Sequence, residues 1–235
     1  LGNNRGVAEA LHNLGTLAHA QGDYDRARSL YGEALVLQRE LGNKKGVSAA
    51  LNNLGLIASE QGDYAGARKY FEESLTTLRD LSDRYGIAAA LSNLGLVAYS
   101  QADYRLAQQL VQESLAIRQD VGDKSGRATS LYNLARIADK LDDLPRARTL
   151  HEESLGLENE LGDKHGQAFS IMNLGSLAAR AGDYAEARAR LEDSLRRFQE
   201  LNDRRAIPEC LAEVAWLAVN EGATTQVSVA ELVER

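Results

Sequence analysis

The tripeptide Asn-Leu-Gly returns along this chain at intervals of 40 residues. It occupies residues 13–15, 53–55, 93–95 and 173–175, and it becomes Asn-Leu-Ala at residues 133–135. A fixed period of this length is typical of a solenoid, in which each repeat buries its apolar face only against its neighbours. We therefore expect an elongated stack of similar repeats whose function lies on exposed surfaces.

Each repeat is expected to hold two helices. A short polar residue suited to an N-cap opens each first helix, and a Gly-Asp pair such as Gly22-Asp23 closes it and caps the second helix. Apolar residues such as Leu11, Leu14 and Ala18 follow the i, i+3, i+4, i+7 spacing of one buried stripe. The pattern predicts helices over about 4–20 and 24–41, repeated every 40 residues.

A single array over residues 1–235 is expected. Its repeats would span about 3–42, 43–82, 83–122, 123–162, 163–202 and an atypical sixth, 203–235. Because residues 1–3 match residues 41–43, the chain reads as if cut from a longer array.

Several residues depart from the repeat pattern. Ala102 and Asp142 replace the glycine that closes a first helix, so these two turns are predicted to use less favourable residues. Pro208 predicts a helix that starts late or bends. Glu213 interrupts the Asn series, and Ser228-Val229-Ala230-Glu231 is typical of a capping box that opens a short last helix.

The order Leu14-Gly15, Ala18, Gly22-Asp23-Tyr24, Ala27, Tyr31 and Ala34 resembles the tetratricopeptide-repeat consensus. The 40-residue form is similar to kinesin light chains, Pins-type adaptors and the sensor arrays of bacterial regulators. The resemblance implies an all-α, right-handed superhelical solenoid of antiparallel helix pairs. It also implies that the first helices line a concave groove.

Composition excludes several other classes of function. A net charge of -7 disfavours a general nucleic-acid surface, and the apolar runs are too short to span a membrane. Cys210 is the chain's one cysteine, and no signal peptide precedes the repeats, so a cytoplasmic location is expected. His12 and His19 are too far apart along a helix to share a metal, so neither a metal nor a cofactor is expected. The carboxylates recur regularly, and no catalytic constellation stands out, which predicts that the protein is not an enzyme.

The recurring asparagines ask for a compensating interaction, because Asn is a mediocre helix former. In the resembled fold, Asn13, Asn53, Asn93, Asn133 and Asn173 would face the groove and offer their amides to an extended peptide. Alternatively, each Asn bonds the neighbouring first helix and only locks the stack. The two interpretations are compatible, and both stay open at this point.

Around the asparagines the groove positions differ from repeat to repeat, as recognition of a particular partner requires. Besides the asparagines, the candidate peptide-binding residues are His12, Tyr99, Tyr132, Arg136, Phe169, Met172 and Arg180. Five of them, from Tyr132 onward, are expected to form one amphipathic pocket, with the arginines holding a carboxylate or carbonyl of the partner.

The leading hypothesis is a protein-interaction scaffold that holds a peptide or partner segment in its groove, within a larger signalling or regulatory protein. The alternative is a homotypic module that assembles through its ends. The residues that suggest such self-association are Leu1, Val227, Val229, Leu232 and Val233.

Overall fold

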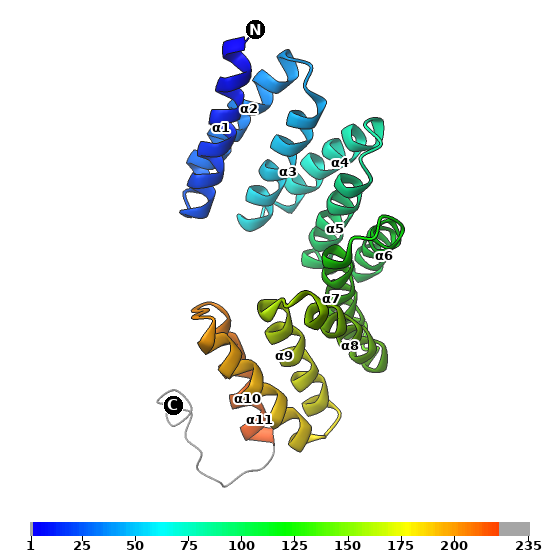
Figure 1. Ribbon diagram of the computed structural model, residues 1–235. Coiled ribbons are helices and arrows are strands. Elements are labelled where there is room, and N and C mark those ends of the chain that lie inside the picture. The colour runs from blue at the N-terminus through cyan, green and yellow to red at the C-terminus, as the bar shows by residue number, and fades with distance from the viewer. Residues whose placement is uncertain (1, 221–235) are drawn as a thin grey trace. The chain divides into compact units, whose positions relative to one another are not determined.

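The computed structural model describes residues 2–220, which form eleven α-helices and no strand (Figure 1). The helices are α1 (Gly2–Ala20), α2 (Tyr24–Glu40), α3 (Lys44–Glu60), α4 (Tyr64–Asp80), α5 (Arg84–Ser100), α6 (Tyr104–Asp120), α7 (Lys124–Lys140), α8 (Leu144–Leu161), α9 (Lys164–Arg180), α10 (Tyr184–Glu200) and α11 (Ala206–Asn220). The predicted all-helical class is confirmed, and the helix bounds agree with the predicted ranges to within two residues in the first repeat.

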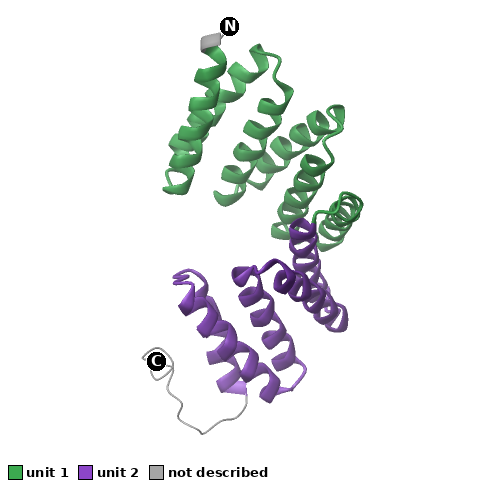
Figure 2. Ribbon diagram, viewed as in Figure 1, with its two compact units in different colours: residues 1–123 green, residues 124–235 purple. Residues whose placement is uncertain are grey.

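The chain divides into two compact units, residues 1–123 and 124–235 (Figure 2). The first helix of each of the first five repeats packs against the second helix that follows it, in the pairs α1–α2, α3–α4 and α5–α6 of unit 1 and α7–α8 and α9–α10 of unit 2. Neighbouring pairs then pack through α2–α3 and α4–α5 in unit 1, and through α8–α9 and α10–α11 in unit 2. The division falls between the third and fourth repeats, and one continuous array over 1–235 stays a prediction.

The two helices of a repeat approach closely where the first helix carries glycine. A Cβ added at Gly55 would lie 2.6 Å from Phe71 Cε1, and one at Gly95 would lie 2.5 Å from Val111 Cγ2. The large side chain of the second helix therefore packs directly onto the backbone of the first. In the fourth repeat the equivalent residues are Ala135 and the buried His151.

A buried serine of the second helix also ties the pair together. Ser74 Oγ donates to the carbonyl of Ser48 (3.1 Å), and Ser114 Oγ donates to that of Ala88 (2.7 Å). Ser154 and Ser194 make the same contact, whereas the first repeat has Ala34 at this position.

The turns follow the sequence closely. Ala102 and Asp142 adopt left-handed backbone conformations, with φ of 60° and 62°, as their alignment with closing glycines predicted. Ser82 and Asn202 do the same at the ends of second helices.

Pro208 has the predicted effect on its helix. The other first helices after α1 begin at Lys44, Arg84, Lys124 and Lys164. With the same period α11 would start at residue 204, but it starts at Ala206. Pro208 therefore lies in the first turn of α11, where its missing N–H costs little. The predicted last helix at 228–231 lies outside the described residues.

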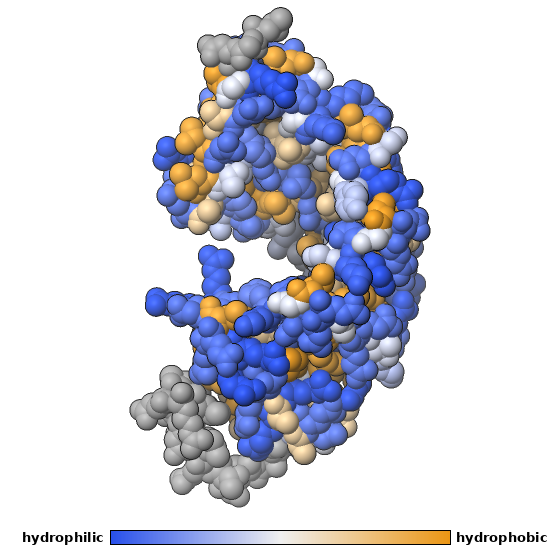
Figure 3. Space-filling model, viewed as in Figure 1, coloured by the Kyte–Doolittle hydropathy of each residue, from blue (hydrophilic) through white to orange (hydrophobic). Residues whose placement is uncertain are grey.

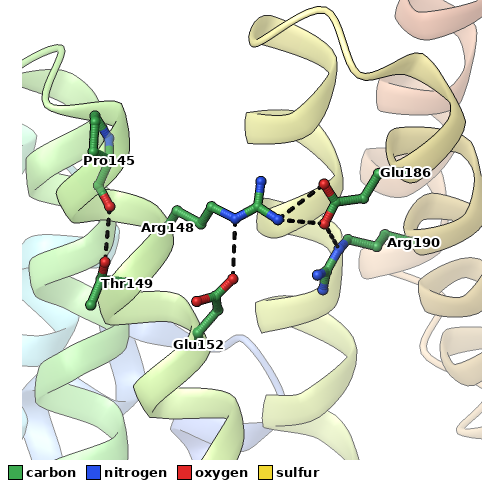
Figure 4. Close-up of polar contacts among 6 residues, drawn as sticks. All are labelled: Pro145, Arg148, Thr149, Glu152, Glu186 and Arg190. Atoms are coloured by element: carbon green, nitrogen blue, oxygen red, sulfur yellow. Dashed lines mark hydrogen bonds and ion pairs between the residues drawn. The ribbon is translucent and has the colours of Figure 1, made fainter.

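In unit 2 an ion-pair network links the second helices α8 and α10 (Figure 4). Arg148 Nη2 donates to both carboxylate oxygens of Glu186, at 2.7 and 3.0 Å, while Arg148 Nε donates to Glu152 at 3.1 Å. Arg190 Nε adds a further bond to Glu186 at 2.8 Å. Each of these arginines and glutamates has an oppositely charged partner within the network, so we assign the network a structural role.

Candidate functional site

Unit 2 contains a pocket of about 300 Å³ where α7, the end of α8 and the start of α9 meet. Its lining residues are Ser125, Ala128, Thr129, Tyr132, Glu158, Leu161, Asp163, His165, Gly166 and Phe169. A volume of this size is at the lower end of the range for small-ligand sites, about 300–1,000 Å³.

Aromatic rings form much of the pocket. The rings of Tyr132 on α7 and Phe169 on α9 are 6.5 Å apart in an edge-to-face arrangement. Phe169 also contacts the His165 ring at 4.9 Å and the buried Phe198 ring at 4.8 Å. Such aromatic contacts hold Phe169 firmly in place.

Asn173 hydrogen-bonds to both Tyr132 and Phe169. Its Nδ2 donates to the carbonyl oxygen of Phe169 at 2.8 Å and to the hydroxyl of Tyr132 at 3.4 Å. Burial raises the pKa of Tyr132, although Arg136 and the bond from Asn173 oppose the shift. The phenol therefore stays neutral at physiological pH.

A buried carboxylate lies beside the rings. Glu158 lines the pocket but is only 3% exposed, and its Oε1 accepts from Ser154 Oγ (2.9 Å) and Ser170 Oγ (3.1 Å). Its Oε2 has no hydrogen-bond partner among the described residues. Burial raises the pKa of Glu158, and the two serine hydroxyls reduce that rise.

His151 lies behind Tyr132 on α8, with the two rings 5.4 Å apart. The imidazole is 1% exposed, and its Nδ1 has no hydrogen-bond partner among residues 2–220. Burial, assisted by the charge of Arg136, lowers the pKa of His151 to about 3. The histidine is therefore neutral except in strong acid.

The same junction in unit 1 lacks these groups. Counting back 80 residues, Asn52 replaces Tyr132, Leu78 replaces Glu158 and Ala89 replaces Phe169. Leu78 is buried, and its Cδ2 would clash with a Cβ added at Gly86. The aromatic pair and the carboxylate thus belong to the fourth and fifth repeats.

The asparagine series joins neighbouring first helices. Asn93 Nδ2 donates to Asn52 Oδ1 at 2.8 Å, and Asn53 Nδ2 lies 3.5 Å from His12 Nε2. With the Asn173–Tyr132 bond, each contact reaches the residue 41 positions earlier. These bonds support the interpretation that the series locks the stack.

The asparagines differ in their exposure. Asn13 is exposed and Asn133 is buried, whereas Asn53, Asn93 and Asn173 keep part of their surface exposed. The amides are therefore not all sealed from solvent, and their role in recognition stays a prediction.

The remaining predicted site residues do not all meet in one pocket. Arg136 lies over the Tyr132 ring, with Cζ 5.8 Å from the ring centroid, but Met172 is buried in the core of unit 2. Arg180 forms ion pairs with Asp139 and Asp142. The structure thus brings Tyr132 and Phe169 together in the pocket, places Arg136 beside it and leaves Met172 and Arg180 out of its lining.

His12 and Tyr99 lie in unit 1, apart from this pocket. The His12 ring packs edge-on against Tyr31 at 5.3 Å, and burial lowers its pKa. Tyr99 packs against Tyr104 at 5.5 Å.

Of the ten lining residues, only Tyr132 and Phe169 were predicted from sequence, and Glu158 and His165 are among those that were not. His165 Nε2 lies 2.8 Å from Asp203 Oδ2, which holds its ring against Phe169. Alignment of the repeats gave a signal for Glu158, because its position holds Gln38, Leu78, Arg118 and Phe198 elsewhere. The residue type at this buried position differs in every repeat, so Glu158 is a feature of the fourth repeat alone.

The visible surface offers no broad apolar band. Figure 3 shows hydrophilic residues over most of the coloured part of this face, with hydrophobic residues scattered among them. None of the helices within residues 2–220 has both the length and the apolar character needed to cross a membrane.

Stacked helix pairs with a 40-residue period define a helical-repeat protein. A family model described as Tetratricopeptide repeat matches residues 6–80 and 86–160, and a second model with this description matches residues 170–205. The chain belongs to the tetratricopeptide-repeat family. None of the curated proteins in the comparison matches it.

Solved structures show the same fold. BtubC (BKLC) from P. vanneervenii is 23% identical with a TM-score of 0.72, over 83% of this chain and 81% of that protein. A Signal Transduction ATPase with Numerous Domains protein with a tetratricopeptide repeat sensor, from Pyrococcus horikoshii, is 16% identical with a TM-score of 0.78, over 90% of this chain and 32% of that one. A Rap protein complexed with Competence and Sporulation Factor is 12% identical with a TM-score of 0.74, over 89% and 65%.

Proposed function

We propose that this protein is an interaction module that binds a peptide or partner segment along its first helices, with its main contacts on α7 and α9. The observation that carries this proposal is the pocket between Tyr132 and Phe169. Aromatic side chains in pockets are frequent anchors of binding energy. Asn173, which holds both residues, would order the site before a partner arrives.

The family supports this proposal, because tetratricopeptide repeats generally mediate protein–protein interaction. The similar Rap protein is complexed with Competence and Sporulation Factor. The similar tetratricopeptide repeat sensor is part of a signal transduction ATPase with numerous domains. By analogy, we infer a non-catalytic part in a cytoplasmic signalling or regulatory protein.

Peptides selected from a random display library against the purified chain provide the test. For a selected peptide, Phe169→Ala and Arg136→Ala should each weaken binding by more than about 1 kcal/mol in calorimetry, as expected for anchors. The controls Glu9→Ala and Ser59→Ala, on first helices of unit 1, should matter less. Equal and negligible effects from all four substitutions would contradict this location.

Self-association is a second candidate, favoured by exposed apolar residues on α1 and α11. Leu14 is 46% exposed, although its equivalents Leu54 and Leu174 are buried, and Val219 on α11 is 80% exposed. A second copy that covered these residues would remove apolar surface from water. Sedimentation velocity over a concentration series tests this candidate, since an unchanged monomer mass would reject it.

A further inference from the structure

We propose that the pocket between α7 and α9 is a subsite for one cationic side chain of the bound segment, a lysine ammonium or an arginine guanidinium. This inference rests on the proposed function, because it names the part of a partner that the pocket takes. Three features of the pocket support it: a buried acceptor, aromatic walls and the sign of the local charge.

The acceptor is Glu158. Its Oε1 lies within hydrogen-bond distance of two serine hydroxyls, while Oε2 has no partner among the described residues. A buried carboxylate oxygen without a donor is costly, and a charge-assisted N–H bond is the contact that repays most of this cost. A bound ammonium or guanidinium would supply both the donor and the opposite charge.

The aromatic walls suit the same ligand. Tyr132 and Phe169 both line the pocket, and a cation near the face of such a ring is attracted by the ring quadrupole. The Tyr132 ring already has the guanidinium of Arg136 5.8 Å from its centroid. An aliphatic stem followed by a charged end matches a pocket with apolar walls and a carboxylate.

The charges that line the pocket disfavour other ligands. The lining includes two carboxylates, Glu158 and Asp163, but neither lysine nor arginine. Arg136 lies beside the pocket, over the Tyr132 ring, so the negative charge of the lining itself is what disfavours an anion. A neutral apolar side chain would leave Glu158 Oε2 without a donor. A metal ion needs more ligands, and no group of three His, Cys, Asp or Glu within the described part of the chain could hold one.

Three small probes test the subsite directly: Nα-acetyl-lysine amide, Nα-acetyl-arginine amide and the neutral Nα-acetyl-norleucine amide. In an NMR titration of the labelled chain, at least one cationic probe should shift the Gly166 and Phe169 amides to saturation. Norleucine should bind at least about tenfold more weakly, as a desolvated cation–π contact implies. Equal binding of norleucine, or no shift with either cation, would overturn the proposal.

Glu158→Gln keeps the shape of the side chain and removes its charge, so it should weaken the cationic probe by about tenfold or more. Glu160→Gln is the matched control, because it changes the net charge equally on the exposed end of α8. Phe169→Ala installs the residue of the equivalent position 89 and should also weaken binding. If Glu158→Gln and Glu160→Gln act alike, long-range charge explains the effect and the subsite is rejected.

The two proposals can fail separately. Library peptides that bind α7 and α9 without enrichment of lysine or arginine would reject the subsite and leave the interaction module standing. Conversely, saturation of the pocket by cationic probes, with no library peptide bound along the first helices, would support a cation site and reject the interaction module.

Discussion

Units 1 and 2 repeat the same helix pair but fill one buried position differently. In unit 1 the large residue that faces the first helix is Tyr31, Phe71 or Val111. In unit 2 it is His151 in the fourth repeat and Leu191 in the fifth. The helices of the fourth and fifth repeats, α7 to α10, keep the 40-residue period to within one residue, so the backbone tolerates an ionisable group at this position.

A second buried position extends the contrast. Unit 1 has polar residues there too, in Gln38 and Arg118, but Glu158 is the position's one carboxylate. Buried ionisable groups weaken a fold unless they are paired. Residues that break local rules in this way concentrate at functional sites, which agrees with the pocket beside them. We therefore expect the buried ionisable groups of the fourth repeat, His151 and Glu158, to lower the stability that the stacked helix pairs provide.

The largest expected difference between the units comes from His151 in acid. The folded pKa of about 3 lies below the ordinary value of 6.5, so the unfolded state binds the proton first. Between these two values the contribution of His151 to the stability of unit 2 should fall by about 1.4 kcal/mol for each unit that the pH falls. Above pH 6.5 the contribution of His151 should be constant.

The single tryptophan, Trp216 on α11, reports on unit 2 by fluorescence during urea unfolding. His151→Leu, which copies position 191, should remove the His151 contribution to the acid slope that the wild-type chain shows. The control Phe71→Leu alters the equivalent position in unit 1 and should leave the slope seen by Trp216 unchanged. Identical slopes for the wild type and His151→Leu would show that the histidine is not buried as neutral imidazole.

An intermediate difference in stability is expected when the buried serine of the second helix, Ser114 in unit 1 or Ser154 in unit 2, is replaced by alanine. Within residues 2–220, Ser114 Oγ donates a hydrogen bond to the carbonyl of Ala88, whereas Ser154 Oγ bonds to the carbonyl of Ala128 and also to Glu158 Oε1. Ser114→Ala should cost about 1 kcal/mol, and Ser154→Ala about 2–3 kcal/mol, because a charged acceptor also loses its donor. Chemical denaturation of each variant measures both values. In a Glu158→Gln background the two costs should converge, and a difference that persisted there would need another cause.

Much of this contrast could be predicted from the sequence, because the 40-residue period fixes both the helix bounds and the equivalent positions. The left-handed turns at Ala102 and Asp142 and the late start of α11 followed from single residues. These features depend on local backbone chemistry, which a short stretch of sequence contains.

The pocket could be predicted only in part. Tyr132 and Phe169 were expected to lie near each other, since both lie on first helices of adjacent repeats. Glu158 comes from a second helix, and its burial depends on side chains from three helices. Arg180 was assigned to the pocket, but it pairs with Asp139, 41 residues earlier, and such a contact depends on packing rather than on local pattern.

The smallest expected difference in stability between the units comes from ion pairs on the second helices. Arg68 in unit 1 and Arg148 in unit 2 are equivalent, and each bonds the glutamate four residues later. Arg148 also reaches Glu186 on α10, whereas the equivalent of Glu186 in unit 1 is Leu106. Arg148→Ala should therefore cost more than Arg68→Ala, with both losses below about 1 kcal/mol because the side chains are partly exposed.

A double-mutant cycle between Arg148 and Glu186 isolates the added contact. Burial alone would raise the pKa of Glu186, but hydrogen bonds from Arg190 and Arg148 lower it overall. The coupling free energy between Arg148 and Glu186 should therefore be present above the ordinary pKa of glutamate. It should be lost as the pH falls through the pKa that Glu186 has in the folded state. High salt should also reduce it, since both partners touch solvent. A coupling that neither acid nor salt reduced would mean that packing of the Arg148 stem, rather than charge, joins α8 to α10.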